Sequence, residues 1–326
     1  MNQFQYVRPT QQRTAITAVA KDPNATFIAG GTNLVDLMKR GVMTPQKLVD
    51  INRLPLTKIE HQKNSLRIGA LALNATVANH QLVRERHPLL AQALNAGASA
   101  QLRNMATVGG NLLQRTRCPY FYDVTLPCNK RQPGSGCGAL EGINRMHAIF
   151  GFSDKCIAVH PSDMSVALAA LDATVLVSGP KGDRSIAFAD LHRLPGDAPE
   201  KDTTLEPGEL ITAVEVPDGH FTRYVSYYKV RERASYAFAL VSVAAALDLD
   251  GDNIVAARLA MGGVAHKPWR LAAAEQHLIG KPATEASFRQ AADVAMQGAK
   301  AFKHNEYKLK LAPNTIVQAL KTAAAA

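Results

Sequence analysis

The chain has 326 residues, which is enough for two or three domains and a large buried core. Apolar residues make up 47% and charged residues 20%, which excludes a collagen, a long disordered chain and a small disulfide scaffold. The longest apolar stretch, near residues 239–247, is too short to span a bilayer, and the first ten residues do not have the pattern of a signal peptide. The formal net charge of +10 is spread along the chain, so it favours an anionic cofactor and partner subunits over nucleic acid.

The predicted elements of the first two thirds alternate between short strands and helices. In chain order, we expect a strand at Thr26–Ala29, a helix at Asn33–Arg40, short strands within 47–70, helices at Pro88–Ala96 and Met164–Leu171, and strands at Thr174–Ser178 and Glu209–Val216.

The pattern changes near residue 220, where three successive strands are followed only by helices. This order predicts a separate C-terminal α+β domain with a three-stranded antiparallel sheet. The expected strands are Tyr224–Val230, Ala239–Leu249 and Ile254–Met261, and the expected helices are Leu271–Leu278, Glu285–Phe302 and Thr315–Lys321.

Two Gly-Gly pairs, each flanked by threonine and asparagine, are candidate phosphate loops. Either pair alone is most simply a tight turn that needs a positive φ. At a strand–turn–helix junction, however, backbone N–H groups can point outward at a phosphate. Together the pairs predict two loops that grip one pyrophosphate from both sides. The segments are Gly30-Gly31-Thr32-Asn33, and Thr107 with Gly109-Gly110-Asn111.

All four cysteines lie between Cys118 and Cys156, with Cys128 and Cys137 between them. Their gaps match neither the paired knuckles of zinc ribbons nor the C-x2-C-x2-C run of bacterial ferredoxins. The segment is rich in proline and glycine, and a long loop of this kind needs something to hold it. The spacing leaves three alternatives open: an iron–sulfur cluster, a structural zinc and two disulfides.

Other candidate residues each have a simple structural interpretation beside a functional one. Asp163 is either a helix cap or an acceptor for sugar or ribityl hydroxyls, and Lys229 is either a solvated charge or a functional cation. His147 and His160 flank Cys156 and are alternative metal ligands. The segment 134–139 matches the letters G-x-G-x-x-A, but no strand precedes it, so it is not a dinucleotide fingerprint.

Several stretches, in this order, resemble the FAD-binding subunits of molybdenum hydroxylases, the family of xanthine dehydrogenase and carbon monoxide dehydrogenase. About 50 residues separate the second Gly-Gly-Asn from the Ser-Asp segment, and all four cysteines lie in that insertion. The insertion, and the run 113–123 before and around Cys118, resemble bacterial periplasmic aldehyde oxidoreductases whose flavin subunit carries an additional [4Fe–4S] cluster. The family-like stretches are Phe27–Leu34, Leu66–Ala70, Leu102–Leu112, Pro161–Asp163, Ala167–Asp172, Ala239–Ala244 and Gly262–Arg270.

The resemblance implies an α+β chain with a two-lobed FAD-binding domain of the carbon monoxide dehydrogenase flavoprotein (PCMH) type. That domain spans 1–220, with lobes at about 1–55 and 56–220 and a [4Fe–4S] insertion at about 115–159; residues 221–326 form the C-terminal domain. The implied cluster ligands are the four cysteines. The implied FAD-binding residues are Phe27, Ile28, Ala29, Gly30, Gly31, Thr32, Asn33, Leu34, Thr107, Gly109, Gly110, Asn111, Asp163 and Lys229.

The resemblance also implies an oxidoreductase subunit with no catalytic residue of its own. A large molybdenum–pterin subunit would oxidise aldehydes to carboxylic acids, and a small subunit with two [2Fe–2S] clusters would relay electrons to FAD here and on to an external acceptor. A partner that bears a signal would carry the complex to the periplasm, with a cytoplasmic location as the alternative. Two other hypotheses are a stand-alone FAD oxidoreductase of this fold and a metal-stabilised scaffold subunit.

Overall fold

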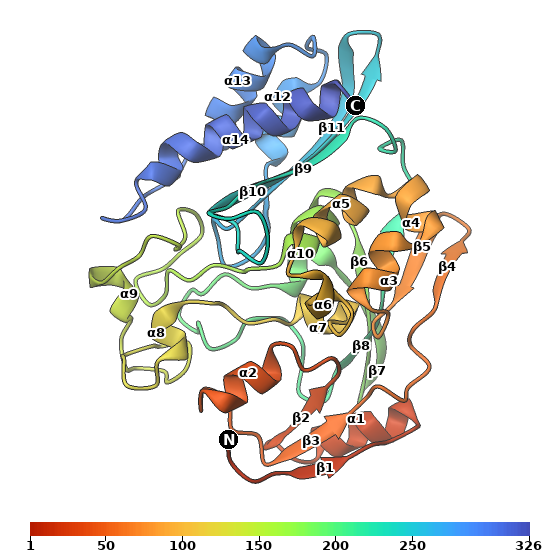
Figure 1. The fold of residues 1–326 in the computed structure, drawn as a ribbon, viewed down its shortest axis with the longest axis vertical. Coiled ribbons are helices and arrows are strands. Elements are labelled where there is room, and N and C mark those ends of the chain that lie inside the picture. The colour runs from red at the N-terminus through yellow and green to blue at the C-terminus, as the bar shows by residue number, and fades with distance from the viewer.

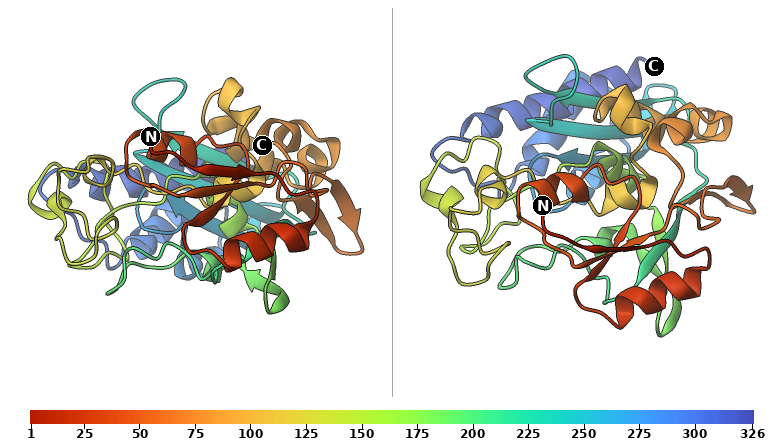
Figure 2. Two further views of the ribbon diagram at one scale, coloured as in Figure 1. Left: turned by 90° about the horizontal axis from the view of Figure 1, so that it is seen from below. Right: turned by 60° about the horizontal axis from the view of Figure 1, so that its bottom comes forward.

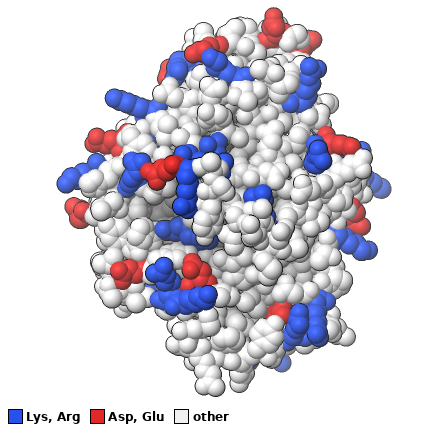
Figure 3. Space-filling view, in the orientation of Figure 1, with Lys and Arg blue, Asp and Glu red and all other residues white.

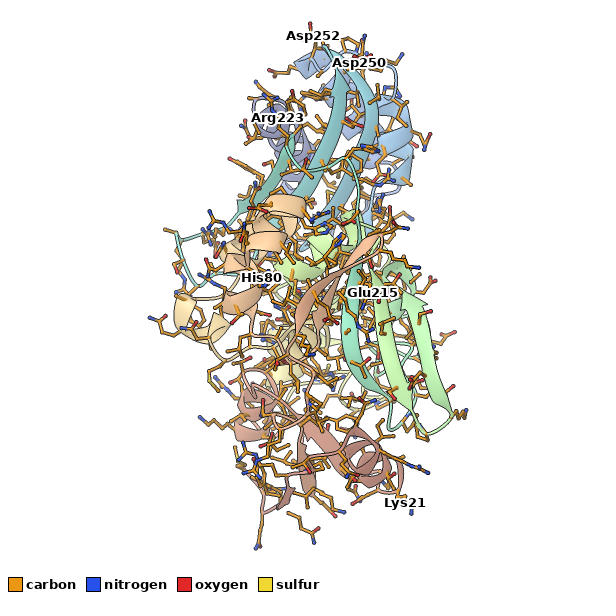
Figure 4. All side chains as sticks on the ribbon, turned by 90° about the vertical axis from the view of Figure 1, so that its right-hand side faces the viewer. Lys21, His80, Glu215, Arg223, Asp250 and Asp252 are labelled. Carbon is orange, nitrogen blue, oxygen red and sulfur yellow. The ribbon has the colours of Figure 1, made fainter.

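Three separate β-sheets organise the chain, and each lies in a different part of the molecule (Figure 1). The computed structural model describes every residue from 1 to 326. Seen from the side, the three parts follow one another along the long axis (Figure 4): Lys21 marks the N-terminal lobe, Glu215 the middle sheet, and Asp250 the tip of the C-terminal hairpin. No helix is both long enough and apolar enough to cross a membrane.

The N-terminal lobe is a small parallel sheet in the order β1-β3-β2, with one helix after each of its first two strands. Its core joins Ala15 and Ile16 of the first helix to Val49 and Ile51 on and after the central strand. The right-hand view of Figure 2 brings this lobe forward. Its elements are β1 (Gln5–Val7), α1 (Gln12–Ala20), β2 (Ala25–Ile28), α2 (Leu34–Lys39) and β3 (Lys47–Asp50).

The middle part is an antiparallel sheet in the order β4-β5-β8-β6-β7, covered on one side by helices that pack on one another. Helix α5 lies at the centre of this helical layer, between α3 and α10. Its strands are β4 (Ile59–Gln62), β5 (Ser65–Gly69), β6 (Thr174–Gly179), β7 (Gly182–Ala187) and β8 (Leu210–Pro217). Its helices are α3 (Asn74–Asn79), α4 (Gln81–Arg86), α5 (Pro88–Ala96), α6 (Ala100–Arg103), α7 (Val108–Leu112), α10 (Asp163–Ala170) and α11 (Phe188–Leu191).

The C-terminal sheet has four strands, so the expected number of three is wrong. The additional strand is only two residues long, and pairs Trp269 and Arg270 with Met261 and Ala260. Two residues are too few to produce an alternating pattern, so no local signal predicts this strand. The elements are β9 (Val225–Val230), β10 (Val241–Asp250), β11 (Asn253–Gly262), β12 (Trp269–Arg270), α12 (Ala272–Leu278), α13 (Glu285–Ala295) and α14 (Tyr307–Ala324).

The expected ends of the last two helices are also wrong. Helix α13 stops at Ala295, before Gly298 takes a positive φ, whereas α14 begins at Tyr307 and runs through Pro313. A proline inside a helix removes one backbone hydrogen bond and disfavours the preceding turn. The apolar face of α14 against β10, which includes fully buried Ile316 and Leu320, offsets this cost.

Residues 115–159 form an irregular segment that lies to one side of the molecule (Figures 1 and 2). It contains only two short helices, α8 (Pro119–Tyr122) and α9 (Gly138–Glu141). The guanidinium of Arg131 donates to the carbonyl oxygens of Tyr120 at 2.8 Å and Phe121 at 2.9 Å, which ties the two halves of the segment together.

A buried lysine connects this segment to the C-terminal domain. Lys308, on α14, is fully buried, and its Nζ donates to the carbonyl oxygens of His147 at 2.9 Å and Gly263 at 2.7 Å. Burial, and then the charge of Arg145, lower the pKa of Lys308 from 10.5 to about 7. The folded protein therefore binds fewer protons than the unfolded chain between pH 7 and pH 10.

From this difference we expect Lys308 to make stability rise with pH above neutrality. Because the unfolded state holds the extra proton, the free energy of unfolding gains up to about 1.4 kcal/mol per pH unit in this window. The Lys308→Met variant lacks the titrating group, so its urea-unfolding profile between pH 7 and pH 9 should be flatter than that of the wild type. Parallel profiles for the two proteins would contradict the assignment.

Candidate functional site

A cavity of about 960 Å³ lies where the N-terminal lobe, the middle helices and the C-terminal domain come together. Its wall combines the segment after β2, the segment around α7, the start of α10 and the end of β9. All fourteen predicted FAD-binding residues line this one cavity: Phe27, Ile28, Ala29, Gly30, Gly31, Thr32, Asn33, Leu34, Thr107, Gly109, Gly110, Asn111, Asp163 and Lys229. The structure thus brings together residues that are far apart in the sequence.

The first Gly-Gly loop has the geometry of an anion cradle. The backbone N–H groups of residues 30–34 have no acceptor anywhere in the chain. Gly31 has a φ of 70°, which favours glycine. The side-chain nitrogen Nδ2 of Asn33 is buried without a partner, while its Oδ1 accepts from the backbone N–H of Arg115 at 2.8 Å. Free donors that line a large cavity fit a bound phosphate group.

Gly30 is required for a different reason, which is close contact between the two loops. A Cβ atom at this position would lie 1.9 Å from the carbonyl oxygen of Met105, far inside any possible contact. The backbone of the first loop therefore rests directly on the segment that leads into α7. This contact fixes the first loop against the wall of the cavity.

The second Gly-Gly pair differs from its predicted role, because its backbone N–H groups are already used. Gly109 donates to the carbonyl oxygen of Ala70 at 2.8 Å, and Gly110 donates to the Thr107 hydroxyl at 3.2 Å, which caps α7. Neither glycine has a positive φ. Asn111 Oδ1 accepts from Ser162 Oγ at 2.6 Å, and its side-chain nitrogen has no acceptor in the chain. The prediction that backbone N–H groups of both loops bind the pyrophosphate is therefore wrong for this second loop.

Asp163 and Lys229 form a buried ion pair in the cavity wall. Lys229 Nζ lies 2.8 Å from Asp163 Oδ2, and the two side chains are 4% and 9% exposed. Asp163 Oδ1 accepts from the Tyr227 hydroxyl at 2.7 Å, and burial and the Asp163 charge raise the pKa of Tyr227 well above its usual range. Ser162, not Asp163, caps α10, and Lys229 is not a solvated charge.

The four cysteines are free thiols, so the alternative of two disulfides is not what the structure shows. An isolated antiparallel bridge pairs Cys128 with Cys137. Burial raises the pKa of Cys118 to about 12, with Cys128 and Cys156 adding to the shift. Burial likewise raises the pKa of Cys156 to about 11, with Cys137 and Cys128 contributing and Lys130 opposing.

A metal site is nevertheless not shown. No group of three or more His, Cys, Asp or Glu side chains is placed so that it could hold a metal ion. Of the two histidines considered as ligands, His147 Nε2 lies 3.1 Å from Cys118 Sγ, whereas His160 Nε2 lies 3.3 Å from Ser165 Oγ. A histidine that the sequence analysis missed, His266, places its Nε2 3.2 Å from Cys156 Sγ.

A smaller cavity lies between the predicted FAD site and the cysteine segment. It has a volume of about 110 Å³, and Cys118 and His147 form part of its wall. Six residues line both this cavity and the large one: Arg117, Met146, Pro161, Ser162, Asp163 and Phe238. The cysteine segment thus lies directly beside the large cavity. No local sequence pattern could predict this adjacency, since it depends on how 115–159 packs on the C-terminal domain.

Comparison with known proteins defines the class to which this fold and cavity belong. The family described as the FAD binding domain in molybdopterin dehydrogenase matches residues 2–219, and the CO dehydrogenase flavoprotein C-terminal domain matches 226–323. The chain therefore belongs to the family of FAD-binding subunits of molybdenum hydroxylases, and it is an oxidoreductase subunit. The family and fold class predicted from the sequence are confirmed.

Individual relatives agree with this assignment. The chain is 50% identical to the aldehyde oxidoreductase FAD-binding subunit PaoB of Escherichia coli K12, over 100% of this chain and 99% of that one. It is 30% identical to the glyceraldehyde dehydrogenase medium chain of Sulfolobus acidocaldarius, over 86% and 82% of the two chains. A carbon monoxide dehydrogenase structure from Hydrogenophaga pseudoflava shares the fold with a TM-score of 0.78, over 99% and 98% of the chains at 24% identity.

Proposed function

We propose that this chain is the FAD- and [4Fe–4S]-containing electron-transfer subunit of a molybdenum-dependent aldehyde oxidoreductase. Its partners would be a large molybdenum–pterin subunit, which oxidises aldehydes to carboxylic acids, and a small subunit with two [2Fe–2S] clusters. Bound here, FAD would supply a redox centre between those clusters and an external acceptor. The 50% identity to an aldehyde oxidoreductase FAD-binding subunit over the full length supports this proposal.

The main structural support for FAD binding comes from the backbone N–H groups of residues 30–34, which have no acceptor in the chain. The two negative charges of a pyrophosphate fit donors that have no partner in the chain, and the orphaned Nδ2 of Asn33 adds one more. The second loop would contribute mainly the side-chain nitrogen of Asn111, with Thr107, Gly109 and Gly110 shaping the wall. Phe27, Ile28, Ala29 and Leu34 would complete the FAD contact surface.

Asp163 would accept hydrogen bonds from the ribityl chain, and Lys229 would place a positive charge near the reduced flavin. The ion pair between them supports both roles, because it holds each side chain in the cavity wall. Tyr227 and Lys229 bond to the two different carboxylate oxygens of Asp163, so each oxygen retains capacity for one further donor.

We expect Asp163→Asn to weaken FAD binding by about 1–3 kcal/mol, because a bound hydroxyl loses its charged acceptor. The amide keeps the shape of the side chain but leaves the buried Lys229 ammonium without its counter-ion, so the melting temperature must be measured beside the FAD affinity. Isothermal titration of FAD into the apo-protein measures the change. Thr284→Ala is the matched control, since it removes the cap of α13 far from the cavity and should lower only the melting temperature. An Asp163→Asn variant with wild-type FAD affinity would refute the role.

Cys118, Cys128, Cys137 and Cys156 would hold the [4Fe–4S] cluster. The donor set fits such a cluster, since all four cysteines are free thiols. The buried ammonium of Lys130 also opposes the rise in the Cys156 pKa and so favours its thiolate. A zinc site, the remaining alternative, would need the same thiolates around a single ion.

The cofactor content of the native complex tests the proposal against its competitors. We expect a yellow-brown complex with flavin absorption bands, a broad iron–sulfur shoulder, molybdenum and two further subunits. A colourless chain would favour the metal-stabilised scaffold. An isolated chain that oxidises a substrate by itself would favour the stand-alone FAD oxidoreductase.

The proposed location is the periplasm, reached by co-export with a partner that carries a signal. The resemblance to periplasmic aldehyde oxidoreductases motivates this proposal. Fractionation of cells that express the whole complex tests it, and recovery of the folded complex in the cytoplasmic fraction would favour the alternative.

A further inference from the structure

Two buried histidines, one inside the cysteine segment and one in the C-terminal domain, each direct a ring nitrogen at a cysteine sulfur. His147 Nε2 lies 3.1 Å from Cys118 Sγ, and His266 Nε2 lies 3.2 Å from Cys156 Sγ. The histidines are 3% and 9% exposed, and the Nδ1 atom of each is buried without a partner. The two contacts are therefore the only side-chain hydrogen bonds that these rings make.

The two histidines come from different parts of the fold, and Lys308 ties their backbones together through the carbonyl oxygens of His147 and Gly263. The carbonyl oxygen of His147 accepts from Lys308 Nζ at 2.9 Å and from Asn305 Nδ2 at 3.1 Å, which fixes the backbone at this position. His266 follows Ala265, whose carbonyl oxygen accepts from the backbone N–H of His160 at 2.9 Å. Because none of these bonds involves an imidazole ring, replacing one ring leaves the backbone at both histidines in place.

The direction of the two hydrogen bonds follows from the chemistry of the sulfur atom. A metal-bound thiolate has no proton and can only accept, so Nε2 of each ring must carry the hydrogen. An N–H donor withdraws electron density from the sulfur and stabilises the reduced, more negative state of a cluster more than the oxidised state. Hydrogen bonds to sulfur are thus one of the means by which a protein sets a cluster's reduction potential.

We propose that His147 and His266 raise the reduction potential of the [4Fe–4S] cluster through N–H···S hydrogen bonds to Cys118 and Cys156. This inference rests on the proposed cluster, and it gives the histidines a positioning role toward the sulfur ligands. The remaining ligands, Cys128 and Cys137, receive no side-chain donor. The cluster is therefore electronically asymmetric, with its donors on the side of Cys118 and Cys156.

The test is a redox titration of the cluster in the intact complex, followed by EPR spectroscopy. We expect His147→Phe and His266→Phe each to shift the midpoint potential to more negative values, and the double variant to shift it further. His147→Gln and His266→Gln retain an N–H donor and should recover part of the wild-type potential. His192→Phe is the control, because His192 is equally buried but bonds to the Leu112 carbonyl oxygen at 2.8 Å.

The possible outcomes distinguish a failure of the histidine inference from a failure of the cluster proposal. Phenylalanine variants with an intact cluster and the wild-type potential would overturn the inference while leaving the cluster in place. A wild-type chain without iron and sulfide would instead refute the cluster itself. If the phenylalanine variants lose the cluster, retention in the glutamine variants supports the N–H donor, and loss there too shows that the rings serve only as packing.

Discussion

Replacing any one of the four cysteines by serine is expected to remove the same iron–sulfur cluster, or to convert it to a three-iron form. A cubane cluster needs a ligand at each iron, so Cys118, Cys128, Cys137 and Cys156 should act as one unit. Iron and sulfide analysis should give close to four of each per chain for the wild type, beyond the clusters of the partners. Each Cys→Ser variant should fall well below that content.

The cysteine variants should also loosen residues 115–159, because this segment has only two short helices of its own. Limited proteolysis should therefore cut the segment faster, and assembly with the partner subunits should suffer. FAD binding should survive in part, since both Gly-Gly loops lie outside the segment. Ser135→Ala is the matched control: it removes the acceptor of the Cys128 backbone N–H at 3.0 Å and leaves every thiol intact.

The competing interpretations predict different patterns. Two disulfides would make the cysteine substitutions act in pairs, and a reductant would mimic them. A structural zinc would give an iron-free protein with no charge-transfer absorption. Zinc without iron in the wild type would overturn the cluster proposal for residues 118–156.

Most of the fold could be predicted from the sequence, because the strands and helices around the cavity have clear local signals. The helix Pro88–Ala96 has the expected bounds, since a proline begins it and Gly97 follows it. By contrast, the start of α14 at Tyr307 has no such signal: Pro313 disfavours a helix there, and only burial against β10 makes one favourable. Local sequence patterns thus predict the elements that have their own start and stop signals, whereas the bounds of the other elements depend on tertiary packing.

Fourteen of the 45 residues that line the large cavity could be predicted as site residues, but the part played by each of them could not. A Gly-Gly pair in the sequence does not show whether its N–H groups are free. Those of residues 30–34 are free, whereas Gly109 is bonded to Ala70, which lies about 40 residues earlier in the chain. The pairing of Asp163 with Lys229 also joins residues far apart in the sequence. Such pairings are set by the packing of the middle helices against β9.

The sequence gives the net charge, but it does not show how the charged side chains are distributed over the folded surface. The excess of basic residues does not form a single tract: on the face shown in Figure 3, blue and red atoms are interspersed. Five basic and four acidic residues line the large cavity, so its charges nearly cancel. The proposed binding of a pyrophosphate there would therefore depend on directed N–H groups more than on net charge.

Gly31→Val is expected to abolish FAD binding while the cluster remains. Gly31 has a φ of 70°, and a valine is strongly disfavoured there because its branched Cβ collides with the following backbone. The new Cβ would also lie 3.1 Å from Val35 Cγ2, so the Val35 side chain must give way by a few tenths of an ångström. Relaxation of the strained φ would turn the N–H groups of residues 30–34 away from the proposed position of the phosphate. Fluorescence of extracted FAD measures the loss, and iron analysis shows whether the cluster is retained.

Gly41→Val separates the effect of backbone strain from the effect on the cradle. Gly41 has a φ of 71°, a Cβ atom at this position would meet nothing within 4 Å, and the residue does not line the cavity. Both variants thus carry the same strained backbone conformation, and both should lower the melting temperature. Only Gly31→Val should lose FAD, because only residue 31 presents its N–H group to the cavity. Equal FAD loss in the two variants would show that the stability of the lobe, and not the cradle, controls binding; full FAD occupancy in Gly31→Val would refute the pyrophosphate assignment.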